Sequence, residues 1–127
     1  MARKVFTAPG AVAVGPYSHA VEAGDFVYLS GQTPAVPGTN KLVEGGIAVQ
    51  TAQCFENLKA VLGAAGLGLG DVVKVNVFLT EMKNFQEMND VYRSQFESPY
   101  PARSTIGVRE LPLGAMIEIE MIARRSR

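Results

Sequence analysis

The sequence predicts an α+β domain in which two helices pack on one face of a mixed β-sheet. Three observations support this prediction. Several short runs are rich in β-branched and aromatic residues, two longer runs carry apolar side chains at helical spacing, and the last run alternates apolar and charged residues. These runs follow one another in the order β-β-β-α-β-α-β-β. The 127 residues suffice for one hydrophobic core, so we expect residues 1–127 to form a single domain.

Three strands are expected in the first third of the chain. Residues 4–7 (KVFT) are β-prone, and a loop interrupted by prolines and glycines follows them. Residues 17–32 read as a hairpin that turns at the Ala-Gly-Asp of residues 23–25. In its second arm, alternation places two sets of side chains on opposite faces, namely Phe26, Tyr28 and Ser30 on one and Val27, Leu29 and Gly31 on the other.

The first helix is expected over residues 47–65, where apolar residues recur at spacings of three and four, and Gly66 ends it. The apolar stripe consists of Phe55, Leu58, Leu62 and Ala65. A β-branched strand over residues 72–80 comes next. Its alternation predicts one face made of Val73, Val75, Val77 and Leu79.

A second helix is expected to begin at Asn84, because Asn84 and Glu87 have the spacing of an N-cap pair. Its apolar side consists of Phe85, Met88, Tyr92 and Phe96, and Pro99 and Pro101 end it.

Two closing strands are predicted, STIGVRE (104–110) and MIEIEMIA (116–123). Alternation in the second gives one face of Met116, Glu118, Glu120 and Ile122, and another of Ile117, Ile119, Met121 and Ala123. The first of these faces is too apolar for open solvent and too charged for a core. It suits a subunit interface that contains a polar cleft, although an edge face partly wetted by solvent suits it nearly as well. Each helix has one apolar stripe, so we expect the helices to cover only the other face.

Charge and composition argue against two classes of partner. Twelve basic residues balance twelve acidic ones, whereas nucleic-acid binders usually carry an excess of positive charge. The basic residues at the end of the chain, Arg124, Arg125 and Arg127, read as a solvated terminus. No apolar run approaches the ~20 residues of a membrane span, and the first residues lack the apolar segment of a signal peptide. We therefore expect a soluble, cytoplasmic protein.

Metal and thiol chemistry find little support in the composition. A zinc site needs three or four ligands, and the chain has one histidine and one cysteine, so no metal is expected. Cys54 lies in the middle of the first predicted helix, where a small inert hydrophobe is the usual role. His19 reads as a packed or surface histidine. The glycines of residues 66–71 follow a helix and precede a strand, the reverse of a dinucleotide-binding loop, so they indicate a helix stop and a turn.

Arg103 is the side chain whose setting suggests a site. It follows two prolines and an alanine, which hold its backbone extended, and a guanidinium can bind a carboxylate with two parallel hydrogen bonds. On this pattern alone, a surface arginine or a structural salt bridge is the better explanation of the position.

Six segments together resemble the RidA/YjgF family in order and spacing: GPYSHAV (15–21), YLSGQ (28–32), AAGLGLGDVVKVNVFL (64–79), MNDVY (88–92), YPARSTIGV (100–108) and IEIEMIA (117–123). The resemblance implies a chorismate-mutase-like fold and a homotrimer with clefts between neighbouring subunits. It also implies an enamine/imine deaminase that needs no cofactor. Such an enzyme hydrolyses 2-iminopropanoate and 2-iminobutanoate to pyruvate or 2-oxobutanoate and ammonia.

The resemblance also assigns roles to residues. Arg103 matches the arginine that grips the substrate carboxylate, and Glu118 matches the acid that positions the hydrolytic water. The matches to cleft residues are Tyr17, Ser30, Gly31 and Asn89. Glu120 receives no such role. Thr105 stands where many members have a cysteine, and hydrolysis does not need that thiol.

Two other functions are also compatible with the sequence. One is a non-catalytic trimer, chaperone-like or sensing a ligand, whose cleft binds small carboxylates. The other is an endoribonuclease, which the single histidine and the zero net charge disfavour. The presence of Glu118 favours a deaminase over a trimer that only binds carboxylates, because a pure carboxylate binder gains nothing from an acid beside the bound anion.

Overall fold

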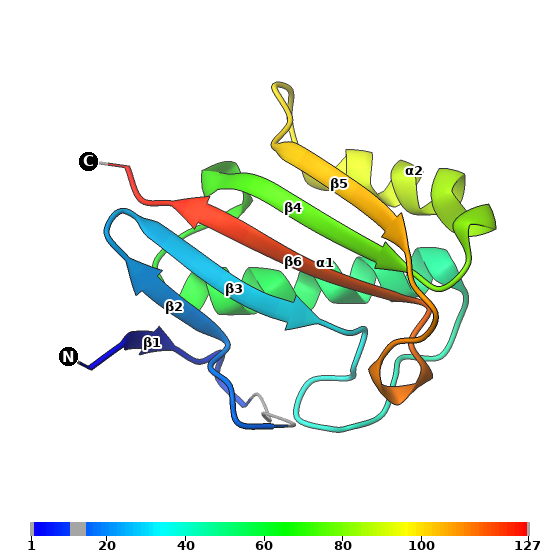
Figure 1. Cartoon of the computed structure of the whole chain (residues 1–127), viewed down its shortest axis with the longest axis horizontal. Helices are drawn as coiled ribbons and strands as arrows, with labels where there is room; N and C mark the ends of the chain where they lie inside the picture. Colours follow the sequence, from blue (N-terminus) through cyan, green and yellow to red (C-terminus); the bar gives the residue numbers. More distant parts are fainter. Residues whose placement is uncertain (1, 11–14, 127) are drawn as a thin grey trace.

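The computed structural model describes residues 2–10 and 15–126, in which six strands form one mixed sheet of order β1-β2-β3-β6-β4-β5 (Figure 1). The strands are β1 (Lys4–Phe6), β2 (Ala20–Ala23), β3 (Phe26–Gln32), β4 (Val72–Leu79), β5 (Ala102–Gly107) and β6 (Ile117–Arg124). The helices are α1 (Ile47–Ala64) and α2 (Phe85–Gln95). Neighbouring strands are antiparallel except for β4 and β5, which are parallel. The predicted α+β fold and its order of elements are confirmed.

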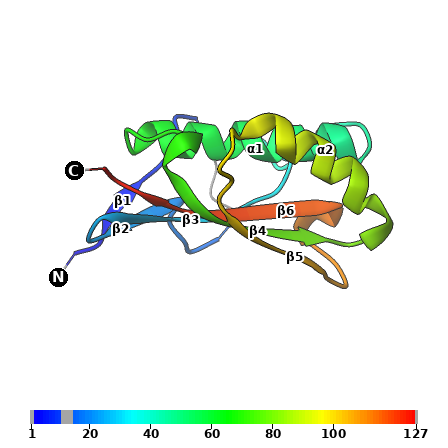
Figure 2. The ribbon, with the colours of Figure 1, turned by 90° about the horizontal axis from the view of Figure 1, so that it is seen from above.

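Both helices lie on the same side of the sheet, and the other side is open (Figure 2). The inward-facing side chains of β6 are the ones that alternation predicted: Ile117, Ile119, Met121 and Ala123, all at most 2% exposed. Glu118, Glu120 and Ile122 are partly exposed on the open side. The predicted assignment of the two faces is confirmed for this strand.

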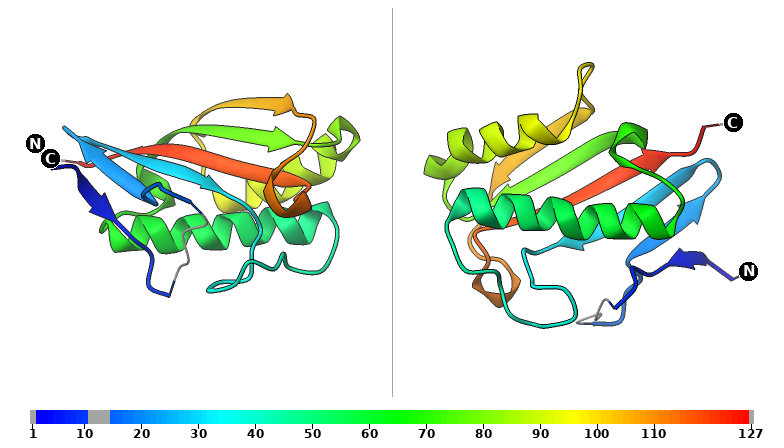
Figure 3. Two further views of the ribbon diagram at one scale, coloured as in Figure 1. Left: turned by 60° about the horizontal axis from the view of Figure 1, so that its bottom comes forward. Right: turned by 180° about the vertical axis from the view of Figure 1, so that it is seen from behind.

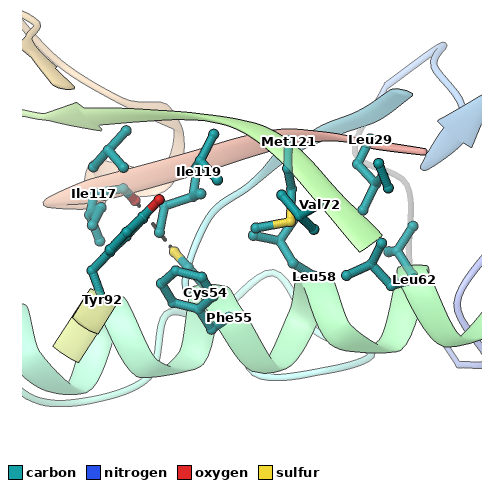
Figure 4. Close-up of a cluster of buried hydrophobic side chains, with 14 of the residues drawn as sticks. Leu29, Cys54, Phe55, Leu58, Leu62, Val72, Tyr92, Ile117, Ile119 and Met121 are labelled. Atoms are coloured by element: carbon teal, nitrogen blue, oxygen red, sulfur yellow. Dashed lines mark hydrogen bonds between the residues drawn. The ribbon is translucent and has the colours of Figure 1, made fainter. Parts of the chain in front are cut away.

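The core lies between α1 and the inner face of β6, β4 and β3 (Figure 4). Phe55, Leu58 and Leu62 of α1 are fully buried there, and each such side chain contributes about 1.5–3 kcal/mol through the hydrophobic effect. Phe55 also joins α1 to α2, because its ring packs edge-on against Tyr92 with 5.7 Å between centroids. Burial raises the pKa of the Cys54 thiol, so the interpretation of Cys54 as an inert hydrophobe agrees with its place in this core.

Two β-bulges make the sheet differ from simple alternation. The pairing of β4 with β6 shifts between Val72 and Lys74, so Val73 is 41% exposed although it was predicted to share a face with Val75. The pairing of β3 with β6 shifts between Leu29 and Gln32. Gly31 was predicted to face the same way as Leu29, but a Cβ atom at this position would point toward Glu118 of the open face.

Several other element boundaries differ from the predicted ones. The first arm of the hairpin begins at Ala20 rather than at residue 17, and β5 starts before Arg103 and ends at Gly107. The Asn84 side chain makes no capping bond, although α2 begins directly after it.

The expectation of a solvated terminus is wrong for Arg125. Its guanidinium lies 2.7 Å from Glu22 Oε1 and also donates to the Ala65 carbonyl at the end of α1. This contact ties the last strand to β2 and to the first helix. No helix in the described part of the chain is long and apolar enough to cross a membrane.

Candidate functional site

Two surface hollows contain predicted site residues, and the larger of these two lies at the end of β3, where the chain leaves the sheet. It has a volume of about 530 Å³. The loop from β3 to α1 and the turn at residues 112–114 lie at this same end of the molecule (Figure 3). Three of the predicted site residues line it: Tyr17, Gly31 and Glu118.

Glu118 supplies the acid of this hollow. It occupies the second position of β6, where it points to the open side of the sheet between two fully buried isoleucines. The pKa of its carboxyl is raised, first because the group is half-buried and second because the negative Glu120 lies near it. A carboxyl with a raised pKa can take up and release a proton closer to neutral pH than an ordinary glutamate does.

The bulge in β3 brings the Gly31 backbone against Glu118. A Cβ atom at position 31 would lie 2.5 Å from Glu118 Oε2 and 2.9 Å from Cδ. Only a glycine therefore leaves the carboxylate where it is, and this close approach explains the Ser-Gly-Gln sequence at the end of the strand.

Ser30 and Tyr17, two further predicted site residues, differ in their relation to the hollow. The Ser30 hydroxyl donates to the Ser18 carbonyl at 2.6 Å, so its proton is already engaged, and Ser30 does not line the hollow. Tyr17 precedes β2 and is 47% exposed, with its ring 6.3 Å from that of His19. Tyr17 thus forms an accessible aromatic wall of the hollow.

Arg103 and Asn89 lie in a second hollow, of about 250 Å³, between β5 and α2. Asn89 Oδ1 accepts a hydrogen bond of 2.7 Å from Arg103 Nη1. The guanidinium carbon lies 4.5 Å from the centre of the Tyr92 ring and 5.6 Å from that of Phe85. Three side chains of one helix therefore fix the orientation of the arginine.

Sequence reasoning missed the part played by Tyr92 and Phe85, which it took only as the apolar side of a helix. The signal was their spacing with Asn89, since positions 85, 89 and 92 follow each other by four and three and so share one helical face. Tyr92 is 5% exposed, burial raises the pKa of its phenol, and its hydroxyl has no partner among the described residues.

Within one chain, Arg103 and Glu118 point to opposite faces of the sheet. Arg103 pairs with Val75, whose side chain is fully buried under the helices. Glu118 pairs with Phe78, which pairs in turn with the 51% exposed Ile106 of the open face. Because directly paired residues share a face, the cation and the acid cannot meet on one substrate inside a single chain.

Two remaining residues of interest take structural positions. Glu120 accepts a hydrogen bond of 2.9 Å from Asn76 Nδ2 on the open face. Thr105 pairs with Val77 on the helix side, and its hydroxyl is buried without a partner among the described residues. In residues 2–10 and 15–126 no three histidine, cysteine, aspartate or glutamate side chains gather as a metal site.

Comparisons with known proteins agree on one family. The family model described as Endoribonuclease L-PSP matches residues 7–125. A RutC family protein of Pyrococcus horikoshii is 46% identical over 123 residues, which are 97% of this chain and 98% of that one. A 2-iminobutanoate/2-iminopropanoate deaminase of Dermatophagoides farinae is 50% identical over 109 residues, with coverages of 86% and 85%. The crystal structure of RidA from Psychrobacter sp. PAMC 21119 matches with a TM-score of 0.90 at 45% identity, over 96% of this chain and 99% of that one.

Proposed function

The chain belongs to the RidA/YjgF family, and from this premise we propose that it is a deaminase that hydrolyses 2-iminopropanoate and 2-iminobutanoate to 2-oxo acids and ammonia. The observation that carries the proposal is the half-buried Glu118 carboxyl, which faces the larger hollow and has a raised pKa. The D. farinae relative bears the name of this activity, while the RutC names of other relatives give only the family.

Hydrolysis of an imine requires one carboxyl group that can both take up and release a proton. A protonated imine is already electrophilic, so the ionised Glu118 takes one proton from a water molecule as the water oxygen bonds to the imine carbon. The C=N electron pair moves to nitrogen and gives a carbinolamine. Glu118 then returns the proton to nitrogen, and the C–N bond breaks as an electron pair of the hydroxyl oxygen forms the carbonyl. Glu118 takes the hydroxyl proton and passes it to the departing ammonia, which leaves as ammonium. General acid–base catalysis of this kind contributes about 10²–10⁴-fold.

Arg103 binds the substrate carboxylate in this proposal. Its guanidinium is held by Asn89 and the Tyr92 ring, so little rotational freedom is lost when a carboxylate binds. Tyr17 covers the substrate from the other side. In this proposal the Gly31 carbonyl is the acceptor for the water or the imine nitrogen, while Ser30, whose hydroxyl donates to the Ser18 carbonyl, holds the end of β3 in place.

We further propose that the functional unit is a homotrimer in which each cleft takes Glu118 from one subunit and Arg103 from its neighbour. The opposite directions of the two side chains within one chain support a shared cleft. The partly apolar open face supports burial against another subunit, because Phe26, Tyr28 and Ile106 are 37–51% exposed on it. The number three comes from the family resemblance, and closed symmetry then gives three equivalent clefts.

Two other functions remain as alternatives. A trimer that only binds small carboxylates would use Arg103 but has no need of a half-buried Glu118. A ribonuclease is the activity in the description of the family model. Metal-free RNA cleavage usually relies on histidines, and the single histidine of this chain, His19, is 4% exposed.

The test is direct. A pyridoxal-phosphate dehydratase generates 2-iminopropanoate in the cuvette, and its loss is followed with and without this protein. The proposal predicts accelerated loss by wild-type protein, near-complete loss of the effect in Glu118→Gln, and retention in the control Glu120→Gln. Unchanged decay of the imine together with cleavage of an RNA substrate would favour the ribonuclease. Unchanged decay with binding of 2-oxobutanoate would favour the carboxylate binder.

A further inference from the structure

We infer that His19 is a second proton-transfer group of the larger hollow, and that it protonates carbon C3 of an enamine substrate to make the imine that Glu118 hydrolyses. The inference rests on the proposed deaminase activity and adds a step before it. An enamine and its imine differ in the place of one proton, which is on nitrogen in the enamine and on C3 in the imine. Water attacks the imine carbon, so an enamine has to be converted first.

The side chain of His19 is buried without the hydrogen bond that a structural histidine normally makes. The residue is 4% exposed, and its Nδ1 atom has no partner among the described residues. A histidine with a purely structural role usually has one ring nitrogen bonded to a carbonyl or a carboxylate. Nothing in the described part of the chain therefore holds Nδ1 in one protonation state, and a role in proton transfer is one of the usual reasons for such an atom.

The position of His19 favours proton transfer over a packing role, because the residue lines the same hollow as Tyr17, Gly31 and Glu118. Its backbone is fixed beside β3, where the Ser30 amide donates to the His19 carbonyl at 2.9 Å. The centre of its ring lies 6.3 Å from that of Tyr17, a spacing typical of packed aromatic rings. A small molecule bound over Glu118 would therefore occupy a hollow that His19 also lines.

Four titratable side chains line the hollow, and His19 is the one best suited to protonate carbon. Glu118 begins the proposed hydrolysis in its ionised form, which has no proton to give. The Glu56 side chain is 63% exposed and lies 3.5 Å from Lys59, so solvent and a cation already surround it. Tyr17 is the fourth. Histidine is the side-chain type whose protonation changes nearest to neutral pH, so it can give and regain one proton in each turnover.

The added step transfers one proton. The imidazolium of His19 gives its proton to C3, the C=C electron pair forms the new C–H bond, and the nitrogen lone pair forms the C=N bond. The product is the protonated imine, and His19 is left neutral until it takes a proton from solvent water. Hydrolysis through Glu118 follows. Together the two steps turn one enamine, one water molecule and one proton from solvent into a 2-oxo acid and ammonium.

Two routes to the same imine separate the enamine step from hydrolysis. A threonine dehydratase releases the enamine of 2-iminobutanoate, and an L-amino-acid oxidase makes 2-iminobutanoate directly from 2-aminobutanoate. Imine hydrolysis alone cannot remove the enamine faster than the enamine converts to the imine in water. The inference predicts that the rate constant of enamine loss, followed by ultraviolet absorbance, rises above this spontaneous value as wild-type protein is added. A plateau at the spontaneous value, with rapid hydrolysis of the oxidase-made imine, would overturn the inference, whereas failure on both routes would overturn the proposed deaminase.

His19→Gln and Glu56→Gln are matched variants, because each replaces a titratable side chain of the hollow by an amide. In His19→Gln the rate constant of enamine loss falls at least about tenfold, to the spontaneous value. Hydrolysis of the oxidase-made imine by the same variant stays within about threefold of wild type. Glu56→Gln should match wild type on both routes. Equal losses on both routes in His19→Gln would reduce His19 to a packing residue and contradict the inference.

Solvent deuterium gives a readout that needs no variant. In D2O the threonine-derived enamine gains a deuteron at C3, and lactate dehydrogenase traps the product as 2-hydroxybutanoate, whose two C3 positions are distinguished by proton NMR. A deuteron delivered by His19 reaches one face of C3, so wild-type protein should place deuterium mainly at one position. The dehydratase alone sets the baseline, and His19→Gln should return to it. A baseline distribution with active wild-type protein, or an unchanged excess in His19→Gln, would overturn the inference.

Discussion

At the scale of single residues, Arg103 depends on one helix for its orientation. The Asn89 amide oxygen accepts from the guanidinium at 2.7 Å, and the Tyr92 ring lies beneath it at 4.5 Å. Tyr92 is itself held by Phe96, at 5.0 Å between ring centroids, and by Phe55 of α1. The arginine is thus positioned by a rigid aromatic cluster that is continuous with the core.

This arrangement makes Tyr92 a positioning residue. Removing the ring in Tyr92→Leu is expected to weaken binding of 2-oxobutanoate about 2- to 30-fold, the range of a cation–π interaction from exposed to desolvated sites. Tyr92→Phe keeps the ring and should bind like wild type. Phe96→Leu removes a ring from the same cluster without touching Arg103, so it controls for lost packing. Calorimetry of 2-oxobutanoate binding measures all three, and equal weakening in Tyr92→Leu and Phe96→Leu would reduce the role to packing.

The Glu118 carboxylate is expected to be needed for activity but to lower the free energy of unfolding at neutral pH. Its pKa is raised on folding, so the folded state binds the proton more tightly than the unfolded state does. The free energy of unfolding therefore falls as the pH rises through the raised pKa. Glu118→Gln removes this effect, and we expect it to melt at a higher temperature than wild type at neutral pH, with a difference that narrows in acid. Thermal unfolding at several pH values tests this, and a lower melting temperature at neutral pH would show that the carboxylate stabilises the fold.

At the scale of elements, alternation predicted β6 correctly because its whole inner face is buried under the helices. Alternation failed at Val73 and Gly31, which lie within the bulges of β4 and β3. A bulge depends on how a strand pairs with a partner far away in the sequence, so the local pattern of either strand does not reveal it.

For the same reason the sequence suggested Arg103 and Asn89 as site residues but not the hydrogen bond between them. That bond depends on how α2 packs beside β5.

The close approach of the Gly31 backbone to Glu118 can be tested by adding a methyl group at position 31. In Gly31→Ala the new Cβ would meet the Glu118 carboxyl, which is the flexible end of a side chain and can move aside. We therefore expect a fold of nearly unchanged melting temperature and a loss of imine hydrolysis of about 10²-fold or more, the lower range of a positioned acid–base group. Gly63→Ala, where a Cβ meets no atom within 4 Å, is the control. Full activity of Gly31→Ala would mean that the position of the carboxylate is not critical.

At the scale of the whole molecule, the two halves of the proposed site lie in separate hollows of one chain. Tyr17, Gly31 and Glu118 line the larger hollow, and Asn89 and Arg103 line the smaller. Subunits arranged around a closed axis would bring the larger hollow of one against the smaller hollow of the next. An assembly of more than one subunit is therefore a condition of the proposed mechanism, since a lone chain would hold the acid and the cation apart.

Complementation between two inactive variants tests this central claim. Arg103→Ala lacks the cation and Glu118→Gln lacks the acid, so each alone should be inactive while it remains folded and assembled. When the two are unfolded and refolded together, about a quarter of the shared clefts receive an intact Arg103 from one chain and an intact Glu118 from the other, if the chains mix at random. We predict recovery of about a quarter of the wild-type rate of imine hydrolysis. Mixed assemblies, demonstrated by sedimentation, that show no recovery would contradict a cleft shared between subunits.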